Sequence, residues 1–204
     1  MARTKAATPK VGEEAPDFNL QSAQGGRLRL SLRTVRGPVV VAFYRPWSEE
    51  DAEYFRALAK KEDDINLALG TIVGIGVAEP DEAREFWRKT GIKSYVLYDY
   101  TREWVPEWGL LERDREHGDY ARPATFIVGK DRRIAHAWFE ERPSPEELFE
   151  RVHEITGLPK PPEEQEEPQK KARKEGEEKA PGGAGRAARE QPEPADGADP
   201  ADED

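Results

Sequence analysis

The sequence predicts an α/β fold in which a central mixed sheet is flanked by helices, followed by a charged C-terminal tail. Two short, continuous apolar runs, at residues 39–44 and 72–77, are typical of strands buried on both faces of a sheet. A stretch of helical period, residues 49–62, separates them. After Ile155 the chain contains no Val, Ile, Phe, Tyr, Trp or Met, and from Gly157 onward it consists mainly of Glu, Lys, Pro, Gly, Ala and Asp.

The composition divides the 204 residues into three parts. Residues 1–10 predict a flexible N-terminus, residues 11–156 a folded domain, and residues 157–204 a disordered, charged, Pro- and Gly-rich tail. The tail has 14 acidic and 8 basic residues, so it carries −6 of the formal charge of −10. Such a segment buries too little apolar surface to offset the entropy of ordering it.

The first elements form a strand–helix–strand unit, which predicts parallel strands joined by a right-handed crossover. A second helix is expected to start at Pro80, a residue suited to the first helical position, and to end at Gly91. Its inward stripe comprises Ala83, Phe86, Trp87 and Thr90. Residues 95–98 predict another strand, and residues 102–108 a short helical segment that Pro106 limits.

Two further strands are predicted at residues 124–128 and 134–139, joined by a loop of hairpin length. Ser144-Pro145-Glu146-Glu147 has the pattern of a capping box and predicts the start of the last helix. Leu148, Phe149, Val152 and Ile155 form its apolar face. A parallel start, an antiparallel hairpin and a closing helix together make the thioredoxin arrangement, so we expect a thioredoxin-like fold.

The composition also excludes several classes of function. The chain contains no cysteine, which excludes disulfides, thiolate metal sites and every cysteine-based mechanism. The net charge of −10 argues against nucleic-acid binding. No apolar run is long enough for a membrane span and no secretory signal is visible, so we expect a cytoplasmic protein. The scattered His117, His136 and His153 predict no metal site, and we expect no cofactor.

Several segments match one family in collinear order. They are residues 11–20 (VGEEAPDFNL), 26–32, 36–45 (RGPVVVAFYR), 77–87, 99–110 and 121–128 (ARPATFIV). Together they resemble the peroxiredoxin family, in its AhpC/TSA and bacterioferritin-comigratory-protein branches, over residues 11–156. The segment at 26–32 resembles the family's small N-terminal hairpin. The resemblance implies a peroxide-reducing cysteine at the start of the helix that follows residues 39–44.

The chain departs from the family where that cysteine would lie. Anchoring the family pattern FYRGxWCPxC on Trp47 places Ser48 and Asp51 at the positions of the two cysteines. The alternative pattern FYPxxxTPxC moves the reactive position to Ala52. Neither choice gives a cysteine, so we expect no thiol peroxidase activity by the family route. The resemblance makes Arg122 the arginine that assists the thiolate, and Pro123 a residue that follows a cis peptide bond.

These vestigial positions have a structural interpretation. Ser48 followed by three acids predicts a helix N-cap whose first turn suits the helix dipole. The same acids would oppose a thiolate. The alternative is a cation site built on the carboxylates. We expect Arg122 to pair with Asp51 or Glu49, with ligand binding as its alternative.

We therefore interpret the chain as a pseudoenzyme that acts as a binding or regulatory module. We expect a protein partner that binds through the tail or through the vestigial groove, and a homodimer is an alternative. Two other hypotheses stay open. One is antioxidant oxidoreductase activity of the family type, supported by similarity alone. The other is a repurposed metal or acid–base site that uses Ser48, Glu49, Asp51 and Arg122.

Overall fold

A computed structural model of the chain describes residues 6–139 and 141–158. Its elements are β1 (Asn19–Ser22), β2 (Arg27–Arg29), α1 (Leu30–Arg33), β3 (Val39–Tyr44), α2 (Glu49–Leu67), β4 (Thr71–Gly76), α3 (Pro80–Thr90), β5 (Tyr95–Tyr98), η1 (Val105–Trp108), β6 (Leu111–Asp114), β7 (Gly118–Ala121), β8 (Ala124–Val128), β9 (Ile134–Phe139) and α4 (Pro145–Thr156). The predicted disordered tail lies outside the described residues from residue 159 onward. Within the described ranges, no helix combines the length and the apolar composition that a membrane crossing requires.

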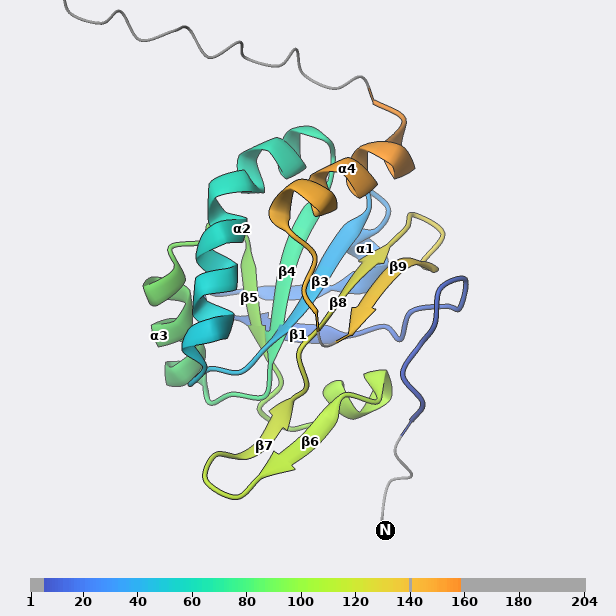
Figure 1. Ribbon diagram of the computed structural model, residues 1–204. Helices are drawn as coiled ribbons and strands as arrows, with labels where there is room; N and C mark the ends of the chain where they lie inside the picture. The colour runs from blue at the N-terminus through green and yellow to red at the C-terminus, as the bar shows by residue number, and fades with distance from the viewer. Residues whose placement is uncertain (1–5, 140, 159–204) are drawn as a thin grey trace, which may run out of the picture. The chain divides into compact units, whose positions relative to one another are not determined.

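The central sheet has seven strands in the order β2-β1-β5-β4-β3-β8-β9. The strand pairs β3–β4 and β4–β5 are parallel, whereas β8 runs antiparallel to β3 and β9 antiparallel to β8. This arrangement confirms the predicted mixed sheet with a parallel start and a closing antiparallel hairpin. It also brings the carboxyl end of β3 and the start of β8 to one edge of the sheet, where α2 begins (Figure 1).

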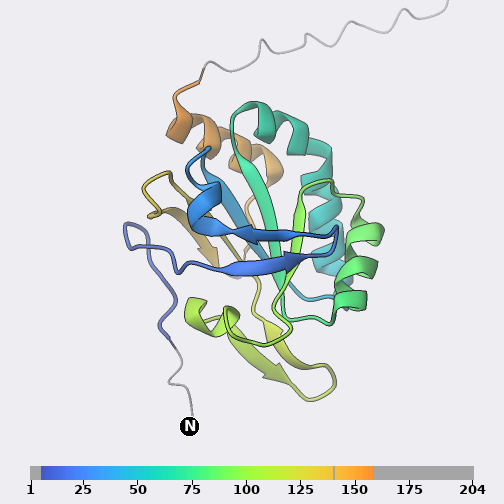
Figure 2. The same ribbon diagram turned by 180° about the vertical axis from the view of Figure 1, so that it is seen from behind.

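Both faces of the sheet are covered, which explains why its central strands are apolar without alternation. On one face α2, α3 and α4 pack side by side against residues such as Val40, Ala42 and Ile127 (Figure 1). On the other face, seen in Figure 2, Phe18 and Trp108 cover Val41 and its neighbours. Successive residues of β3 therefore belong to two separate cores.

Some elements differ from their predicted bounds. Helix α2 continues to Leu67 because Ile65 extends its buried stripe by two turns. Only residues 105–108 of the predicted segment 102–108 are helical, as a 3-10 turn. The preceding residues instead wrap around the buried carboxylate of Asp99, which accepts backbone N–H groups of Glu103, Trp104 and Val105 at 2.7–3.0 Å.

The N-terminal hairpin lies earlier than predicted. It is formed by β1 and β2 over residues 19–29, and the predicted second half becomes α1. Asp17 explains this helix, because its Oδ1 accepts the N–H groups of Phe18 and Ser31 at 3.0 and 2.9 Å. Of the predicted flexible N-terminus, residues 6–10 are described, and the side chain of Thr8 donates to the carbonyl of Gly109 at 3.4 Å.

Helices α3 and α4 both begin with side-chain capping interactions, but only one of them has a complete capping box. The Ser144 hydroxyl accepts the N–H of Glu147 at 3.1 Å at the start of α4, which is one half of the predicted capping box. The full reciprocal pair occurs at α3, between Glu79 and Glu82. There Pro80 occupies the first helical turn, as the sequence predicts.

Asp17→Asn is expected to lower the free energy of unfolding by about 1 kcal/mol near neutral pH, a value reduced for its partial exposure. Burial acts to raise the pKa of Asp17, but hydrogen bonds from Arg29, Ser31 and Phe18 outweigh it and hold the pKa below its ordinary value. The contribution is therefore present above the unfolded-state pKa and lost as the pH falls through the lower folded-state pKa.

Urea unfolding at pH 7 and at about pH 3 measures this difference. Glu53→Gln is the control, since Glu53 is exposed on α2 and has no partner among the described residues. If the difference in the free energy of unfolding between wild type and Asp17→Asn were the same at both pH values, ionised Asp17 would not be the source of the stabilisation.

Candidate functional site

Ser48 caps the start of α2, where the family resemblance places a cysteine. Its backbone is extended, at φ −79° and ψ 120°, and its hydroxyl accepts the N–H of Asp51 at 3.2 Å. Glu49, Glu50 and Asp51 occupy the first turn, at the positive end of the helix dipole. The capping interpretation of this segment is confirmed.

Asp51, at the second cysteine position, is fully buried and fully hydrogen-bonded. Its Oδ2 accepts the backbone N–H of Arg45 at 2.7 Å and the Nε–H of the same residue at 3.0 Å. Its Oδ1 accepts from Nη2 of Arg45 at 3.0 Å and from Nη2 of Arg142 at 2.7 Å. Two guanidinium groups thus enclose one carboxylate, and we call this set the Arg45–Asp51–Arg142 cluster.

Arg142 connects this cluster to the sheet. Its side chain is 11% exposed, and its Nη2 also donates to the carbonyl oxygen of Phe43 at 2.9 Å. Its guanidinium carbon lies 4.5 Å from the centroid of the Tyr54 ring, a cation–π contact. Burial raises the pKa of Tyr54 to about 12, so this phenol stays neutral. The hydrogen bonds to Asp51 likewise raise the pKa of Arg45.

The other two acids of the first turn are also ion-paired. Glu49 contacts Lys89 and Arg56, and these hydrogen bonds hold its pKa below the ordinary value. Glu50 pairs with Arg45 at 3.1 Å. A cation would therefore have to displace protein cations at each carboxylate. Across residues 6–139 and 141–158, no group of three His, Asp or Glu side chains is placed to hold a metal ion.

Arg122 does not pair with Asp51 or Glu49, so that prediction was wrong. Its Nε lies 3.6 Å from Oε1 of Glu112, and its Nη2 donates to the Thr8 hydroxyl at 3.4 Å. The reason is competition, because Arg45 and Arg142 already occupy both oxygens of Asp51. The cis bond expected before Pro123 stays a prediction.

The sequence reasoning missed the two arginines of the cluster. Arg45 could have been found, since it directly follows β3 at the edge where α2 begins. Arg142 lies 91 residues from Asp51 in the chain, and only the fold of the segment before α4 brings it there. The hairpin of β6 and β7 was also missed, because its strands (LERD and GDYA) lack an apolar alternation.

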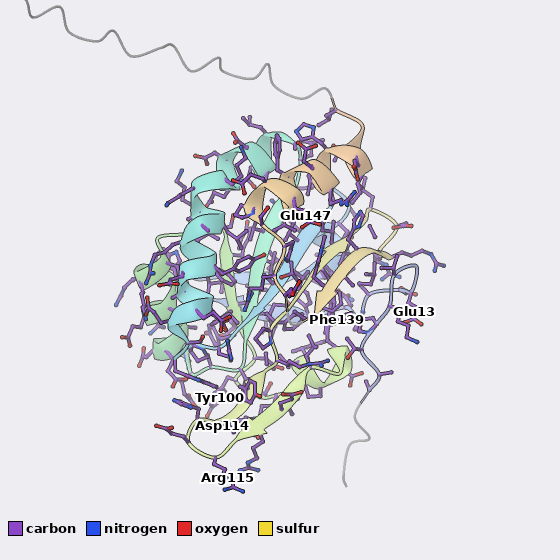
Figure 3. All side chains as sticks on the ribbon, viewed as in Figure 1. Glu13, Tyr100, Asp114, Arg115, Phe139 and Glu147 are labelled. Atoms are coloured by element: carbon purple, nitrogen blue, oxygen red, sulfur yellow. The ribbon has the colours of Figure 1, made fainter. Side chains whose placement is uncertain are left out.

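That hairpin covers Trp47. The indole ring is stacked on His117 at a centroid distance of 4.3 Å and an interplanar angle of 5°, and it meets Tyr120 edge-on at 5.8 Å. Figure 3 shows Tyr100 near this hairpin, with Asp114 and Arg115 at its turn. The Nδ1 atom of His117 lies 3.2 Å from Oδ1 of Asp114.

Two hollows flank Trp47, and we call them together the Trp47 groove. One, of about 190 Å³, is lined by Trp47, Val77, Ala78, Glu79, Glu82, Tyr100, Arg102, His117 and Asp119. The other, of about 290 Å³, is lined by Pro46, Trp47, Glu82, Glu85, Phe86 and Lys89. The first hollow has three carboxylates and one guanidinium, and that guanidinium, of Arg102, is paired with Asp119 at 3.0 Å.

A sequence model described as the AhpC/TSA family matches residues 11–137. Among solved structures, peroxidoxin BcpB from Mycobacterium tuberculosis is similar at 19% identity and a TM-score of 0.62, over 72% of this chain and 98% of its own. A variant of PrxQ from Xylella fastidiosa has 14% identity and a TM-score of 0.61, over 74% and 98%.

A putative thiol:disulfide interchange protein DsbE from Chlorobium tepidum has 18% identity and a TM-score of 0.61, over 74% of this chain and 100% of its own. At these identities the likeness shows a shared thioredoxin-like fold. A comparison with curated proteins gave no match.

Asp51→Ala is expected to lower the free energy of unfolding by about 3 kcal/mol or more, because it leaves two largely buried guanidinium groups without their counter-ion. Glu50→Gln is the matched control, since its carboxylate is 81% exposed and its pair with Arg45 contributes at most about 1 kcal/mol. Chemical denaturation of the full chain measures both. Equal losses in the two variants would show that the cluster does not stabilise the fold.

Proposed function

This chain belongs to the AhpC/TSA family, and we propose that it acts without redox turnover, as a module that binds a protein partner. The main support for this proposal is what occupies the two positions where the family pattern has cysteines, Ser48 and Asp51. Family chemistry needs a thiolate that attacks peroxide and is regenerated from a sulfenic acid. Here the chain has no cysteine, Ser48 caps a helix, and Asp51 is held by Arg45 and Arg142.

The same contacts favour binding over a repurposed acid–base site. A serine becomes a nucleophile when a neighbouring base takes its proton. The Ser48 hydroxyl instead accepts a backbone N–H. The carboxylate next to it in the sequence, that of Glu49, is paired with Lys89 and Arg56 and is not free to act as the base. Asp51 has no oxygen left to accept a substrate proton, because arginine N–H groups occupy both.

The Trp47 groove is the surface that we propose for the partner. Trp47 is half-buried, and Tyr100 is 51% exposed beside it, which gives the groove an aromatic wall. Across the groove the four carboxylates of Glu79, Glu82, Glu85 and Asp119 outnumber the two cations, Arg102 and Lys89, so the groove favours a positively charged occupant. A Lys or Arg side chain placed over an indole or phenol ring gains a cation–π contribution. The proposed partner is therefore a protein that presents a basic segment.

The pure protein is expected to consume no hydrogen peroxide above the buffer rate in the presence of a thiol reductant, because neither vestigial position can form a sulfenic acid. The measurement follows peroxide loss by the full chain together with Ser48→Ala and Asp51→Asn. Turnover by the wild type that disappears in either variant would overturn the proposal.

Peptides selected from a random library on the immobilised full chain are expected to be rich in Lys and Arg. Tyr100→Ala is expected to weaken their binding about tenfold, which corresponds to the loss of one desolvated cation–π contact and its buried area. Tyr95→Ala is the control, since Tyr95 is also exposed, at 36%, but lies outside the groove. Selection of acidic peptides, or equal binding by Tyr100→Ala, would contradict the assignment of this surface.

A further inference from the structure

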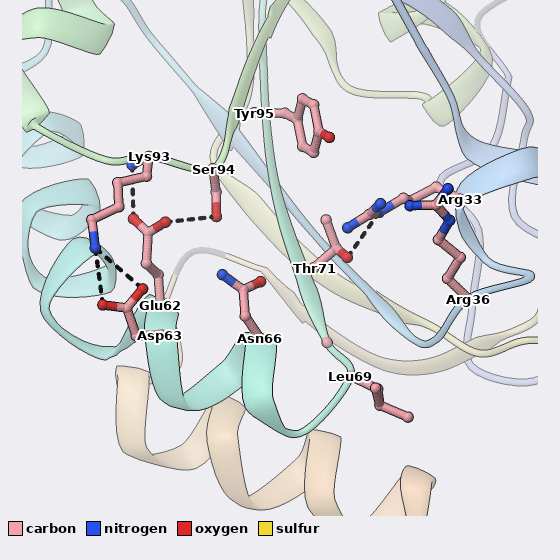
Figure 4. Close-up of a pocket in the computed structure, with 11 residues that line it drawn as sticks. Arg33, Arg36, Glu62, Asp63, Asn66, Leu69, Thr71, Lys93, Ser94 and Tyr95 are labelled. Atoms are coloured by element: carbon pink, nitrogen blue, oxygen red, sulfur yellow. Dashed lines mark hydrogen bonds and ion pairs between the residues drawn. The ribbon is translucent and has the colours of Figure 1, made fainter.

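Another hollow, separate from the Trp47 groove, lies at the other end of the domain, and the proposed function does not use it. It is bordered by the end of α2, the starts of β4 and β5, the end of α1 and the segment that follows α1 (Figure 4). Helix α2 has 19 residues and so separates the two places by ~28 Å. The hollow has a volume of about 440 Å³, within the range of small-molecule sites.

Two arginines face this hollow from one side, as Figure 4 shows. Arg33 is held in place, because its Nε donates to the Thr71 hydroxyl at 2.9 Å and its guanidinium carbon lies 5.6 Å from the centroid of the Tyr95 ring. Arg36 lies three residues further along the chain. In the part of the chain that the structure describes, its guanidinium has no hydrogen-bond or ion-pair partner.

The acids on the opposite side of the hollow are already satisfied. Glu62 is 1% exposed and accepts the N–H of Lys93 at 2.8 Å and the hydroxyl of Ser94 at 3.1 Å. The carboxylate of Asp63 pairs with Nζ of Lys93 at 2.9 Å. The guanidinium groups of Arg33 and Arg36 are therefore cations without a carboxylate partner among the described residues, in a chain whose net charge is −10.

Two exposed side chains with apolar surface, Leu69 and Tyr95, line the hollow among mostly polar residues. Leu69 lines it, 48% exposed, with a positive φ of 64° that bulky residues rarely adopt. In this conformation the Leu69 carbonyl oxygen lies so close to Gly37 that a Cβ atom on residue 37 would be only 2.0 Å from it. Nine large hydrophobic side chains are exposed among the described residues, and two of them, Leu69 and Tyr95, line this hollow. Three more, Leu32, Val35 and Leu67, lie on the neighbouring segments outside its lining.

We propose that this hollow binds a small organic anion, with its phosphate or carboxylate group between Arg33 and Arg36 and its apolar body against Leu69 and Tyr95. Planar guanidinium groups bind such oxyanions through paired, charge-assisted hydrogen bonds. Arg33 is already ordered by Thr71 and Tyr95, so binding costs little of its conformational entropy. Leu69 and Tyr95 gain from contact with a hydrocarbon or aromatic body, which inorganic phosphate lacks.

Calorimetric titration of the full chain with phenyl phosphate, benzoate and inorganic phosphate tests this proposal. Phenyl phosphate is expected to bind more tightly than inorganic phosphate, and Arg36→Gln to weaken it about tenfold or more. Arg36→Lys keeps the charge but loses the paired geometry, so it is expected to restore only part of the affinity. Comparison of phenyl phosphate with benzoate decides which oxyanion is preferred.

Arg115→Gln is the matched control, because Arg115 is exposed at the turn of the β6–β7 hairpin and its loss changes the net charge equally. It is expected to leave the affinity for phenyl phosphate unchanged. Absence of saturable binding by all three probes, or an equal loss in Arg36→Gln and Arg115→Gln, would overturn the proposal. Since Arg36 is exposed, the ligand-free melting temperature of its variants is expected to match the wild type, which separates binding from folding.

Discussion

The carboxylate of Asp51 is the group on which the structure around the start of α2 depends. It lies in the first turn of α2, yet it is bonded to the residue that follows β3 and to a residue that precedes α4. A buried charge costs several kcal/mol to desolvate, and the cost is offset only when its lone pairs are satisfied. Four N–H donors from two arginines satisfy this one. The end of β3, the start of α2 and the segment before α4, which lies 91 residues further along the chain, are thereby held in a single geometry.

This cluster also determines what chemistry the site can supply. A carboxylate carries negative charge as a thiolate does, so it can draw arginines toward the start of α2. Unlike a thiolate, it has no accessible sulfenic-acid state and does not reduce peroxide. Arg45 and Arg142 are committed to Asp51, and Arg122, which the family resemblance makes the assisting arginine, lies against Glu112. The surface beside it, around Trp47, keeps aromatic groups that the cluster does not occupy.

Local patterns predicted most of the sheet and little of the site. The strands at 124–128 and 134–139 agree with the structure to the residue, because apolar runs with a turn between them encode a hairpin locally. The strands of β6 and β7 carry polar residues and pair beside the main sheet, so no alternation indicated them. The partner of Arg122 was predicted wrongly because several cations compete for Asp51. Which of them pairs with it depends on distances that only the tertiary structure sets. Arg142 shows the same limit, since nothing near it in the sequence points to residue 51.

The two proposed surfaces lie at opposite ends of α2 and have opposite charge. Glu49, Glu50 and Asp51 occupy the first turn of α2, as the helix dipole favours, whereas its last turn has no basic residue and the arginines at that end come from α1 and the segment after it. Helix stability therefore accounts for the acids in the first turn of α2. It does not account for a half-exposed leucine at positive φ, nor for an exposed tyrosine next to an indole stacked on histidine. Exposed apolar and aromatic groups cost free energy in water, and a ligand that covers them recovers it. Leu69 and Tyr100 therefore favour binding at each end more than the charges around them do.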